Sequence, residues 1–296
     1  MHRFMFLFIG VLVAASANAG DPSVKKTIDY VQKLQAANGA FRPFEAKSDE
    51  PTPGPTLRST SAAIRALKYL GGELPNKEGC VKFVESCWDR DAGAFCDEPK
   101  GKPDVFTTAV GIMAVVNLQL STQAYSDASI KYFRDNARTF EEVRLAAAGM
   151  ENLKATTPKV ELWHKPIAAL RNDDGTFGKG PGLARDSASA AVTLMRLEPS
   201  ADLPKERILK VIRAGQRQNG GWGKGDNEIA SDLETTYRVM RCFMMLKAQP
   251  DNVEGVRSFV AKCRNADGGY GIAPGKTSTV GATYFAVITM HWLKTP

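Results

Sequence analysis

Hydrophobic residues recur at helical spacing along most of the 296-residue chain, in two alternating patterns. Segments of the first pattern have one apolar and one charged face: 23–35, 80–88, 129–137, 162–170, 207–216 and 256–264. Segments of the second pattern are small or apolar on most sides: 59–70, 106–118, 141–153, 187–197, 234–246 and 281–293. Because a helix without a wide charged face must be covered by neighbours, we predict six inner helices surrounded by six amphipathic outer helices.

A Gly-x-aromatic turn joins most outer helices to the inner helix that follows. It occurs five times, with the aromatic residue at Phe41, Phe95, Phe177, Trp222 and Tyr270. The second gap is nearly twice the others, so we place a sixth, degenerate unit there, with Phe140 as its aromatic residue. A repeated helix–turn–helix unit predicts an all-α fold, here an α/α toroid of six helical hairpins with an inner and an outer ring. We interpret the turns as structural joints, because they lack the patterns of phosphate-binding loops.

The first 19 residues have the features of a signal peptide. Arg3 supplies a short basic start, an apolar run follows, and Ala17-Asn18-Ala19 is a small-x-small cleavage site. We therefore expect an exported protein, periplasmic or extracellular, with residues 20–296 forming a single toroid domain. Loss of Arg3 leaves 38 basic against 32 acidic residues, a modest excess that favours anionic ligands. No basic run or nucleic-acid-binding motif accompanies this charge, and no second apolar segment is long enough to span a membrane.

Five cysteines leave two alternatives open. An exported protein can form disulfides, and Cys87 with Cys96 is the closest pair across a turn. Because the count is odd and no CxxC motif occurs, free buried thiols are the other interpretation.

The repeat resembles the α/α toroid of protein prenyltransferase β subunits and of squalene and terpene cyclases. Gln216, Gly220 and Trp222 match the Gln-x3-Gly-x-Trp motif of the cyclases, and residues 35–41 form a weaker copy. The resemblance spans the mature chain, whose length is most similar to that of a type II geranylgeranyltransferase β subunit.

The resemblance implies a zinc site, which we tested residue by residue. At the start of an inner helix, Glu234 stands at the family's aspartate, Thr236 at its cysteine and Tyr237 at its tyrosine. No histidine lies at the start of the last inner helix, and His164 and His291 fall elsewhere. Because two of three ligands are missing, we predict no metal and no cofactor. Glu234 and Thr236 remain as catalytic candidates.

The resemblance also implies an isoprenyl diphosphate at the mouth of the toroid. Tyr237 matches a tyrosine that contacts the diphosphate, Arg185 lies near a contacting histidine, and Lys224 lies in a loop that carries a basic contact. Parallel repeats bring further cations to the same rim, so the predicted ligand-binding set is Tyr237, Arg185, Lys224, Lys179, Lys276 and Arg58. The alternative is that the loop lysines are only solvated.

Three functions stay open. The first is an exported, prenyltransferase-like protein that binds an isoprenoid or another anionic, apolar ligand and has divergent or no transferase activity. The second is a carbohydrate-active enzyme that uses two carboxylates at the mouth, drawn from Glu234, Asp232, Asp186 and Asp104. The third is a non-catalytic scaffold for a protein partner. The cyclase acid motif Asp-x-Asp-Asp is absent, since the aspartates at 89, 91, 173 and 174 lie in turns.

Overall fold

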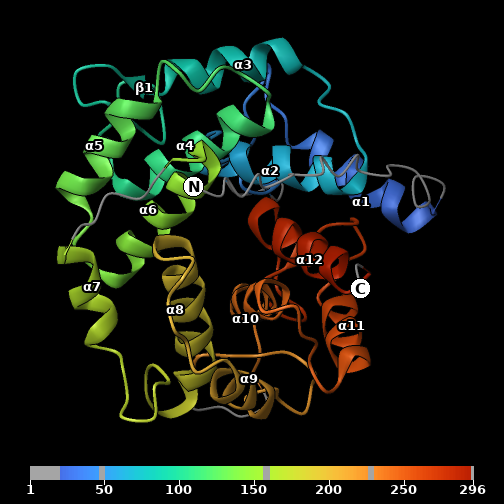
Figure 1. The fold of residues 1–296 in the computed structure, drawn as a ribbon. Helices are drawn as coiled ribbons and strands as arrows, with labels where there is room; N and C mark the ends of the chain where they lie inside the picture. The colour runs from blue at the N-terminus through green and yellow to red at the C-terminus, as the bar shows by residue number, and fades with distance from the viewer. Residues whose placement is uncertain (1–20, 47–50, 156–160, 226–229, 295–296) are drawn as a thin grey trace, which may run out of the picture.

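A computed structural model describes residues 21–46, 51–155, 161–225 and 230–294, and its twelve α-helices alternate between two rings (Figure 1). The outer helices are α1 (Pro22–Lys33), α3 (Lys77–Ser86), α5 (Ser126–Asn136), α7 (Glu161–Ala168), α9 (Lys205–Ala214) and α11 (Val253–Lys262). The inner helices are α2 (Leu57–Leu70), α4 (Val105–Asn117), α6 (Phe140–Leu153), α8 (Leu183–Leu197), α10 (Leu233–Met245) and α12 (Val280–Trp292). The predicted α/α toroid of six hairpins is confirmed. The predicted signal peptide lies outside the described residues.

Short elements occupy the connections between the helices. Strands β1 (Trp88–Asp89) and β2 (Ala94–Phe95) form one antiparallel pair, and β3 (Tyr270–Gly271) and β4 (Ser278–Thr279) form another. A 3-10 turn, η1 (Gly180–Gly182), precedes α8. Within the described part of the chain, no helix is both long enough and apolar enough to cross a membrane.

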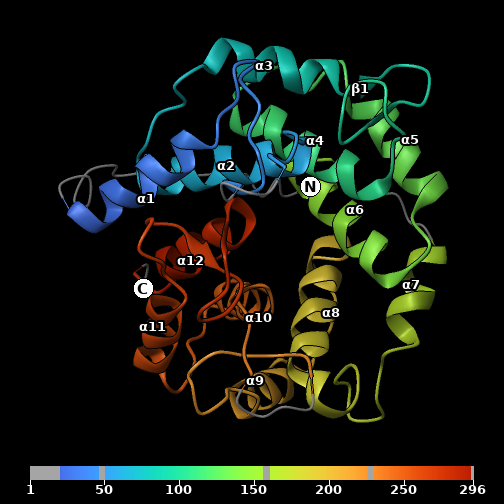
Figure 2. The same ribbon diagram turned by 180° about the vertical axis from the view of Figure 1, so that it is seen from behind.

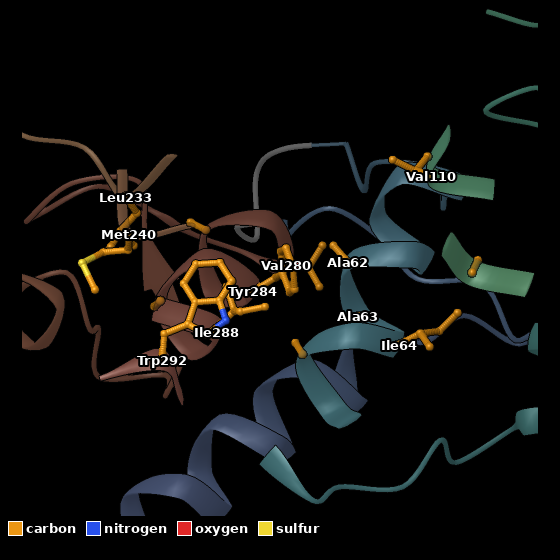
Figure 3. Close-up of a cluster of buried hydrophobic side chains, with 14 of the residues drawn as sticks. Ala62, Ala63, Ile64, Val110, Leu233, Met240, Val280, Tyr284, Ile288 and Trp292 are labelled. Atoms are coloured by element: carbon orange, nitrogen blue, oxygen red, sulfur yellow. The ribbon is translucent and has the colours of Figure 1, made fainter. Parts of the chain in front are cut away.

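The inner ring is closed, because each inner helix packs against the next and α12 packs against α2 (Figures 1 and 2). Figure 3 shows this junction, where Ala62 of α2 faces Val280 and Tyr284 of α12. The backbone N–H of Val280 donates to the carbonyl of Pro43 at 2.8 Å. In the outer ring, the hydroxyl of Thr27 donates to the carbonyl of Gly268, also at 2.8 Å. The first and last hairpins are therefore joined by side-chain packing, by a backbone hydrogen bond and by a side-chain hydrogen bond to the backbone.

Each Gly-x-aromatic turn is tied to its inner helix by one repeated hydrogen bond. The N–H of the aromatic residue donates to a buried hydroxyl in the second turn of that helix, at 2.9–3.1 Å. The pairs are Phe41 with Thr60, Phe95 with Thr108, Phe177 with Ser187, Trp222 with Thr236, and Tyr270 with Thr283. These bonds fix the angle between the turn and the inner helix in five of the six hairpins.

The remaining hairpin, α5–α6, uses a different connection, and the assignment of Phe140 as a turn residue was wrong. Phe140 is the first residue of α6, and only residues 137–139 separate it from α5. Thr139 caps α6 instead: its hydroxyl accepts from the N–H of Glu142, whose carboxylate accepts from the N–H of Thr139. A capping box thus starts this inner helix without a glycine turn.

The glutamine and tryptophan of the Gln-x3-Gly-x-Trp segment make structural contacts. The amide of Gln216 donates at 2.8 Å both to the carbonyl of Gly220 and to that of Asn252 in the next unit. The indole of Trp222, fully buried, donates to the carbonyl of Ile212 on α9. Gly220 has a φ of +92°, and a Cβ at this position would collide with the backbone of Gly255. These contacts support the interpretation of the turn as a joint between hairpins.

All five cysteines are free and buried. Burial raises the pKa of Cys80 and of Cys242 to about 12, so both thiols stay protonated at neutral pH. Cys87 and Cys96 meet through a backbone hydrogen bond, from the N–H of Cys96 to the carbonyl of Cys87. Of the two alternatives for the cysteines, the structure has free thiols.

Candidate functional site

The inner ring encloses a cavity of about 700 Å³, to which all six inner helices contribute. One part of its wall is aliphatic or aromatic: Ala62, Tyr69, Phe106, Val110, Met113, Val116, Leu145, Ala148, Val280, Tyr284 and Phe285. The other part is charged, with seven cationic side chains (Arg58, Arg65, Lys68, Arg144, Arg196, Arg238 and Arg241) against three carboxylates (Glu141, Glu151 and Glu234). The cavity therefore combines an apolar surface with an excess of positive charge.

The carboxylate of Glu141 organises the charged side chains near the N-terminal ends of α6 and α10. Both of its oxygens accept from Arg238, at 2.7 and 3.0 Å, and one accepts from Arg144 at 2.9 Å. Arg238 also binds Glu234 at 2.5 Å, one turn away on α10. Burial alone would raise the pKa of Glu141, but hydrogen bonds and charges from Arg238 and Arg144 outweigh it and hold this pKa at about 2. Glu141 is therefore ionised throughout the physiological range.

A second charged group lies deeper along the inner helices, around Tyr237. The guanidinium of Arg241 donates to the Tyr237 hydroxyl at 3.3 Å and lies 4.6 Å from the centre of the Trp292 ring. Arg65 lies 4.1 Å from the centre of the Tyr284 ring. The ring of Tyr237 stacks on Trp292, with centroids 5.6 Å apart. Aromatic faces from α10 and α12 thus hold two guanidinium groups in place.

Tyr237 has an unusual acidity for a tyrosine. Burial opposes ionisation of the phenol, but the positive charges of Arg241, Arg65 and Arg196 outweigh burial and lower its pKa to about 7. A tyrosine that ionises near neutral pH reports a strongly positive environment inside the cavity.

The structure brings three predicted site residues, Glu234, Tyr237 and Arg58, to the cavity wall. Arg58 lies at the start of α2 and pairs with Asp97 and Asp104, at 3.3 and 3.2 Å. Thr236 is different, because it faces away from the cavity: its buried hydroxyl accepts the hydrogen bond from the N–H of Trp222. The repeated turn-to-helix hydrogen bond accounts for a threonine at this position, and the catalytic role of Thr236 stays a prediction.

The remaining predicted cations lie outside the cavity wall. Arg185 reaches Glu141 at 3.5 Å and Asp186 at 3.0 Å, behind the residues that line the cavity. Lys179, Lys224 and Lys276 are exposed on the loops that precede inner helices and do not line the cavity. The three loop lysines are thus exposed to solvent, and their predicted role in ligand binding stays a prediction.

Sequence reasoning missed the arginines within the inner helices: Arg65, Arg144, Arg196, Arg238 and Arg241. The side chains of Arg196 and Arg238 are only 7% and 8% exposed. A signal was present, since each arginine interrupts a segment predicted to be covered on most sides. A buried charge is costly unless it is paired or functional, so such interruptions mark a lined cavity.

The acids proposed for polysaccharide cleavage are held in structural roles. Asp104 and Asp232 are the N-caps of α4 and α10, where their carboxylates accept from the N–H groups of Thr107 and Thr235. Asp186 binds Arg185. The carboxylates that do line the cavity are ion-paired, and the low pKa of Glu141 is the opposite of what a general acid needs.

The described residues contain no group of three or more His, Cys, Asp or Glu side chains that could hold a metal ion. His164 on α7 pairs with Glu198 at 3.4 Å, and the His291 ring lies tilted against the ring of Tyr69, with centroids 4.9 Å apart. Glu234 lies at the start of α10, whereas His291 lies in the last turn of α12 and His164 on the outer helix α7. The donor set expected of a family-type zinc site therefore does not fit here.

Comparison with known proteins identifies the family to which this fold belongs. The family model described as the prenyltransferase alpha-alpha toroid domain matches residues 3–143 and again residues 144–296. No curated protein matches the sequence. A protein from Actinoplanes is similar in structure, with a TM-score of 0.63 and 12% identity over 92% of this chain and 99% of that one.

Two further similar structures contain prenyl ligands. One is a type II terpene cyclase from Scytonema in complex with geranylgeranyl dihydroxybenzoate, with a TM-score of 0.62 and 9% identity over 92% of this chain and 96% of that one. The other is the Candida albicans protein geranylgeranyltransferase-I complexed with GGPP, with a TM-score of 0.59 and 12% identity over 80% and 83%. At these identities the likeness shows the fold alone. Because the family model covers nearly all of the sequence, the chain belongs to the prenyltransferase α/α-toroid family.

Proposed function

We propose that the protein binds an isoprenoid with an anionic head group, such as geranylgeranyl diphosphate, in its central cavity. The observation that carries this proposal is the cavity itself, which joins an aliphatic and aromatic wall to seven cationic side chains against three carboxylates. Its volume of about 700 Å³ lies within the usual range of small-molecule sites. The prenyl ligands of the two similar structures support the same ligand class.

We further propose that this binding is not accompanied by zinc-dependent transfer to a thiol. Thr236 stands where the resemblance requires a cysteine thiolate, and its hydroxyl is already engaged by Trp222. We propose that any transferase activity of this chain would resemble that of a type II geranylgeranyltransferase β subunit. Such an activity would require an α-type partner subunit. The signal-peptide pattern of residues 1–19 supports export of the mature chain, with the ligand met outside the cytoplasm.

Thermal unfolding of the mature protein tests the proposal. Geranylgeranyl diphosphate at 100 times its dissociation constant should stabilise the native state by about 2.7 kcal/mol. For a chain of this size, the melting temperature should rise roughly 2–4 °C per kcal/mol. The shift should be the same in metal-free and in zinc-supplemented buffer.

A matched pair of variants locates the ligand. Met113→Trp fills the cavity with an apolar ring and should abolish the shift, whereas Met244→Trp, at an exposed position on the same ring of helices, should retain it. An unchanged melting temperature of the wild type with every isoprenoid would refute the proposal. A shift that requires zinc would refute the absence of the metal site.

A further inference from the structure

The arginines in and beside the cavity differ in whether a carboxylate pairs with them. Arg144, Arg185 and Arg238 all contact the carboxylate of Glu141, and Arg238 also contacts Glu234. Arg65 and Arg241 are different: among the described residues, no carboxylate lies within ion-pair distance of either guanidinium. An anion that enters the cavity therefore meets two guanidinium groups that have no carboxylate partner, those of Arg65 and Arg241.

These two arginines donate few hydrogen bonds to the protein. Arg65 donates to the carbonyl of Ser61 at 3.0 Å and to the sulfur of Met113 at 3.6 Å. Arg241 donates to the hydroxyl of Tyr237, and its Nε is buried without a hydrogen-bond partner. Arg196, the third arginine close to Tyr237, binds Glu151 at 2.9 Å through its Nε. Guanidinium groups offer five donors each, so most of this donor capacity remains unused.

The position of the pair is well inside the toroid. Arg65 and Arg241 are each the ninth residue of their helices, α2 and α10. Eight steps of helical rise place them roughly 12 Å along the helix axis from the first residue. The exposed lysines at 179, 224 and 276 precede the inner helices, so they lie at the other end of this path.

We propose that Arg65, Arg241 and Arg196 bind the charged head group of the ligand in the middle of the cavity, and that Tyr237 is their internal counter-ion until the ligand replaces it. This inference rests on the proposed function, because it assumes that an anionic isoprenoid enters the cavity. On binding, the Tyr237 phenolate takes up one proton from solvent, so the cluster exchanges one negative charge for another.

The acidity of Tyr237 supports this role. Burial opposes its ionisation, yet Arg241, Arg65 and Arg196 lower its pKa to about 7. The charged or titratable groups that face it come from every inner helix near it: Arg65 and Tyr69 on α2, Arg144 and Glu151 on α6, Arg196 on α8, Arg241 on α10 and Tyr284 on α12. A bound anion would offset the three arginines, return the Tyr237 pKa towards its ordinary value and so favour the neutral phenol.

The sign of the pH dependence follows. Below about pH 7, Tyr237 is already protonated, so binding needs no proton and the affinity is constant with respect to this group. Above about pH 7, each bound ligand requires one proton, so the dissociation constant should rise by up to tenfold per pH unit. Neutral geranylgeraniol should show no such dependence.

Isothermal titration calorimetry with geranylgeranyl diphosphate, geranylgeraniol and inorganic pyrophosphate tests the inference. Arg65→Gln and Arg241→Gln should weaken geranylgeranyl diphosphate about tenfold or more and leave geranylgeraniol unchanged. Tyr237→Phe should abolish the pH dependence above pH 7. In the wild type, addition of the diphosphate at pH 8 should remove a tyrosinate absorbance band that Tyr237→Phe lacks.

Lys179→Gln and Lys224→Gln test the competing location at the rim. If these variants lose affinity and Arg65→Gln and Arg241→Gln do not, the head group binds at the rim and the inference is overturned. If Arg65→Gln or Arg241→Gln fails to fold, the comparison of pH profiles between wild type and Tyr237→Phe decides, and matching profiles overturn the inference.

The two proposals fail in different ways. Equal binding of geranylgeraniol and geranylgeranyl diphosphate at every pH would overturn the head-group site and leave an isoprenoid cavity. Binding of neither compound by the wild type would overturn the proposed function itself.

Discussion

Replacement of Thr236 by valine tests whether this threonine has a structural or a catalytic role. Valine keeps the shape and removes the hydroxyl that accepts from the N–H of Trp222 at 3.1 Å. Thr236 and Trp222 are both fully buried, so water cannot replace the lost acceptor. A buried donor left without a partner costs about 1–3 kcal/mol, which for a chain of this size lowers the melting temperature by roughly 2–12 °C.

The assay is thermal and urea unfolding of residues 20–296, alongside a binding measurement with geranylgeranyl diphosphate. Thr193→Val is the matched control: Thr193 is equally buried, but its hydroxyl only donates to the carbonyl of Ser189 on its own helix. Its removal orphans no donor, so its cost should be smaller. Thr236→Val should bind ligand with unchanged affinity. Unchanged stability together with lost binding would refute the reasoning and return Thr236 to the functional site.

The hydrogen bond from the turn to the inner helix also occurs in four other hairpins. Three further predictions concern the turns, the ion pairs and the thiols. Gly220→Ala should lower the free energy of unfolding in urea by more than about 2 kcal/mol, because the backbone is left-handed there and the new Cβ would collide with the backbone of Gly255. Gly54→Ala is the control and should be neutral, because open space surrounds that glycine. Equal effects of the two substitutions would contradict this reasoning. Glu141 has a pKa of about 2 against an ordinary 4.5, so its stabilisation is complete above pH 4.5 and is lost as the pH falls towards 2. The stability of Glu141→Gln should therefore lie below that of the wild type at pH 7 and approach it near pH 2; a constant difference would contradict the pairing. A thiol reagent should find no reactive cysteine in the native protein and five after unfolding without reductant, whereas three would indicate a disulfide between Cys87 and Cys96.

The architecture was predictable because its determinants are local. Helical periodicity and glycine turns act within one hairpin, so five units could be located from residue spacing alone. Phe140 was misassigned because a capping box at Thr139 performs the task of the turn, and an aromatic residue beside it had no distinguishing pattern.

The site was less predictable because its contacts join residues far apart in the sequence. Glu141 and Arg238 are 97 residues apart, and nothing in either segment indicates that they pair. Tyr237 was found through resemblance to a family motif, but its acidity depends on arginines from α2 and α8. The loop lysines show the opposite difficulty. Lysines precede several inner helices in the sequence, and we expected them at the ligand, but they do not line the cavity.

The junction between the first and last hairpins has a consequence for how the molecule assembles. The hydrogen bond from Thr27 to Gly268 spans 241 positions of the chain. In a linear array of repeats, stability grows as each unit is added to its neighbour. In a ring, the contacts between the first and last hairpins stabilise the fold only once the two ends of the chain have come together, which costs loop-closure entropy for the whole chain. Partial rings would leave small, apolar inner helices open to solvent, so the hairpins should form early and the cavity last, in a single slow step. A circular permutant that opens the chain between two middle hairpins should keep the same ring and the same cavity, while its order of assembly changes.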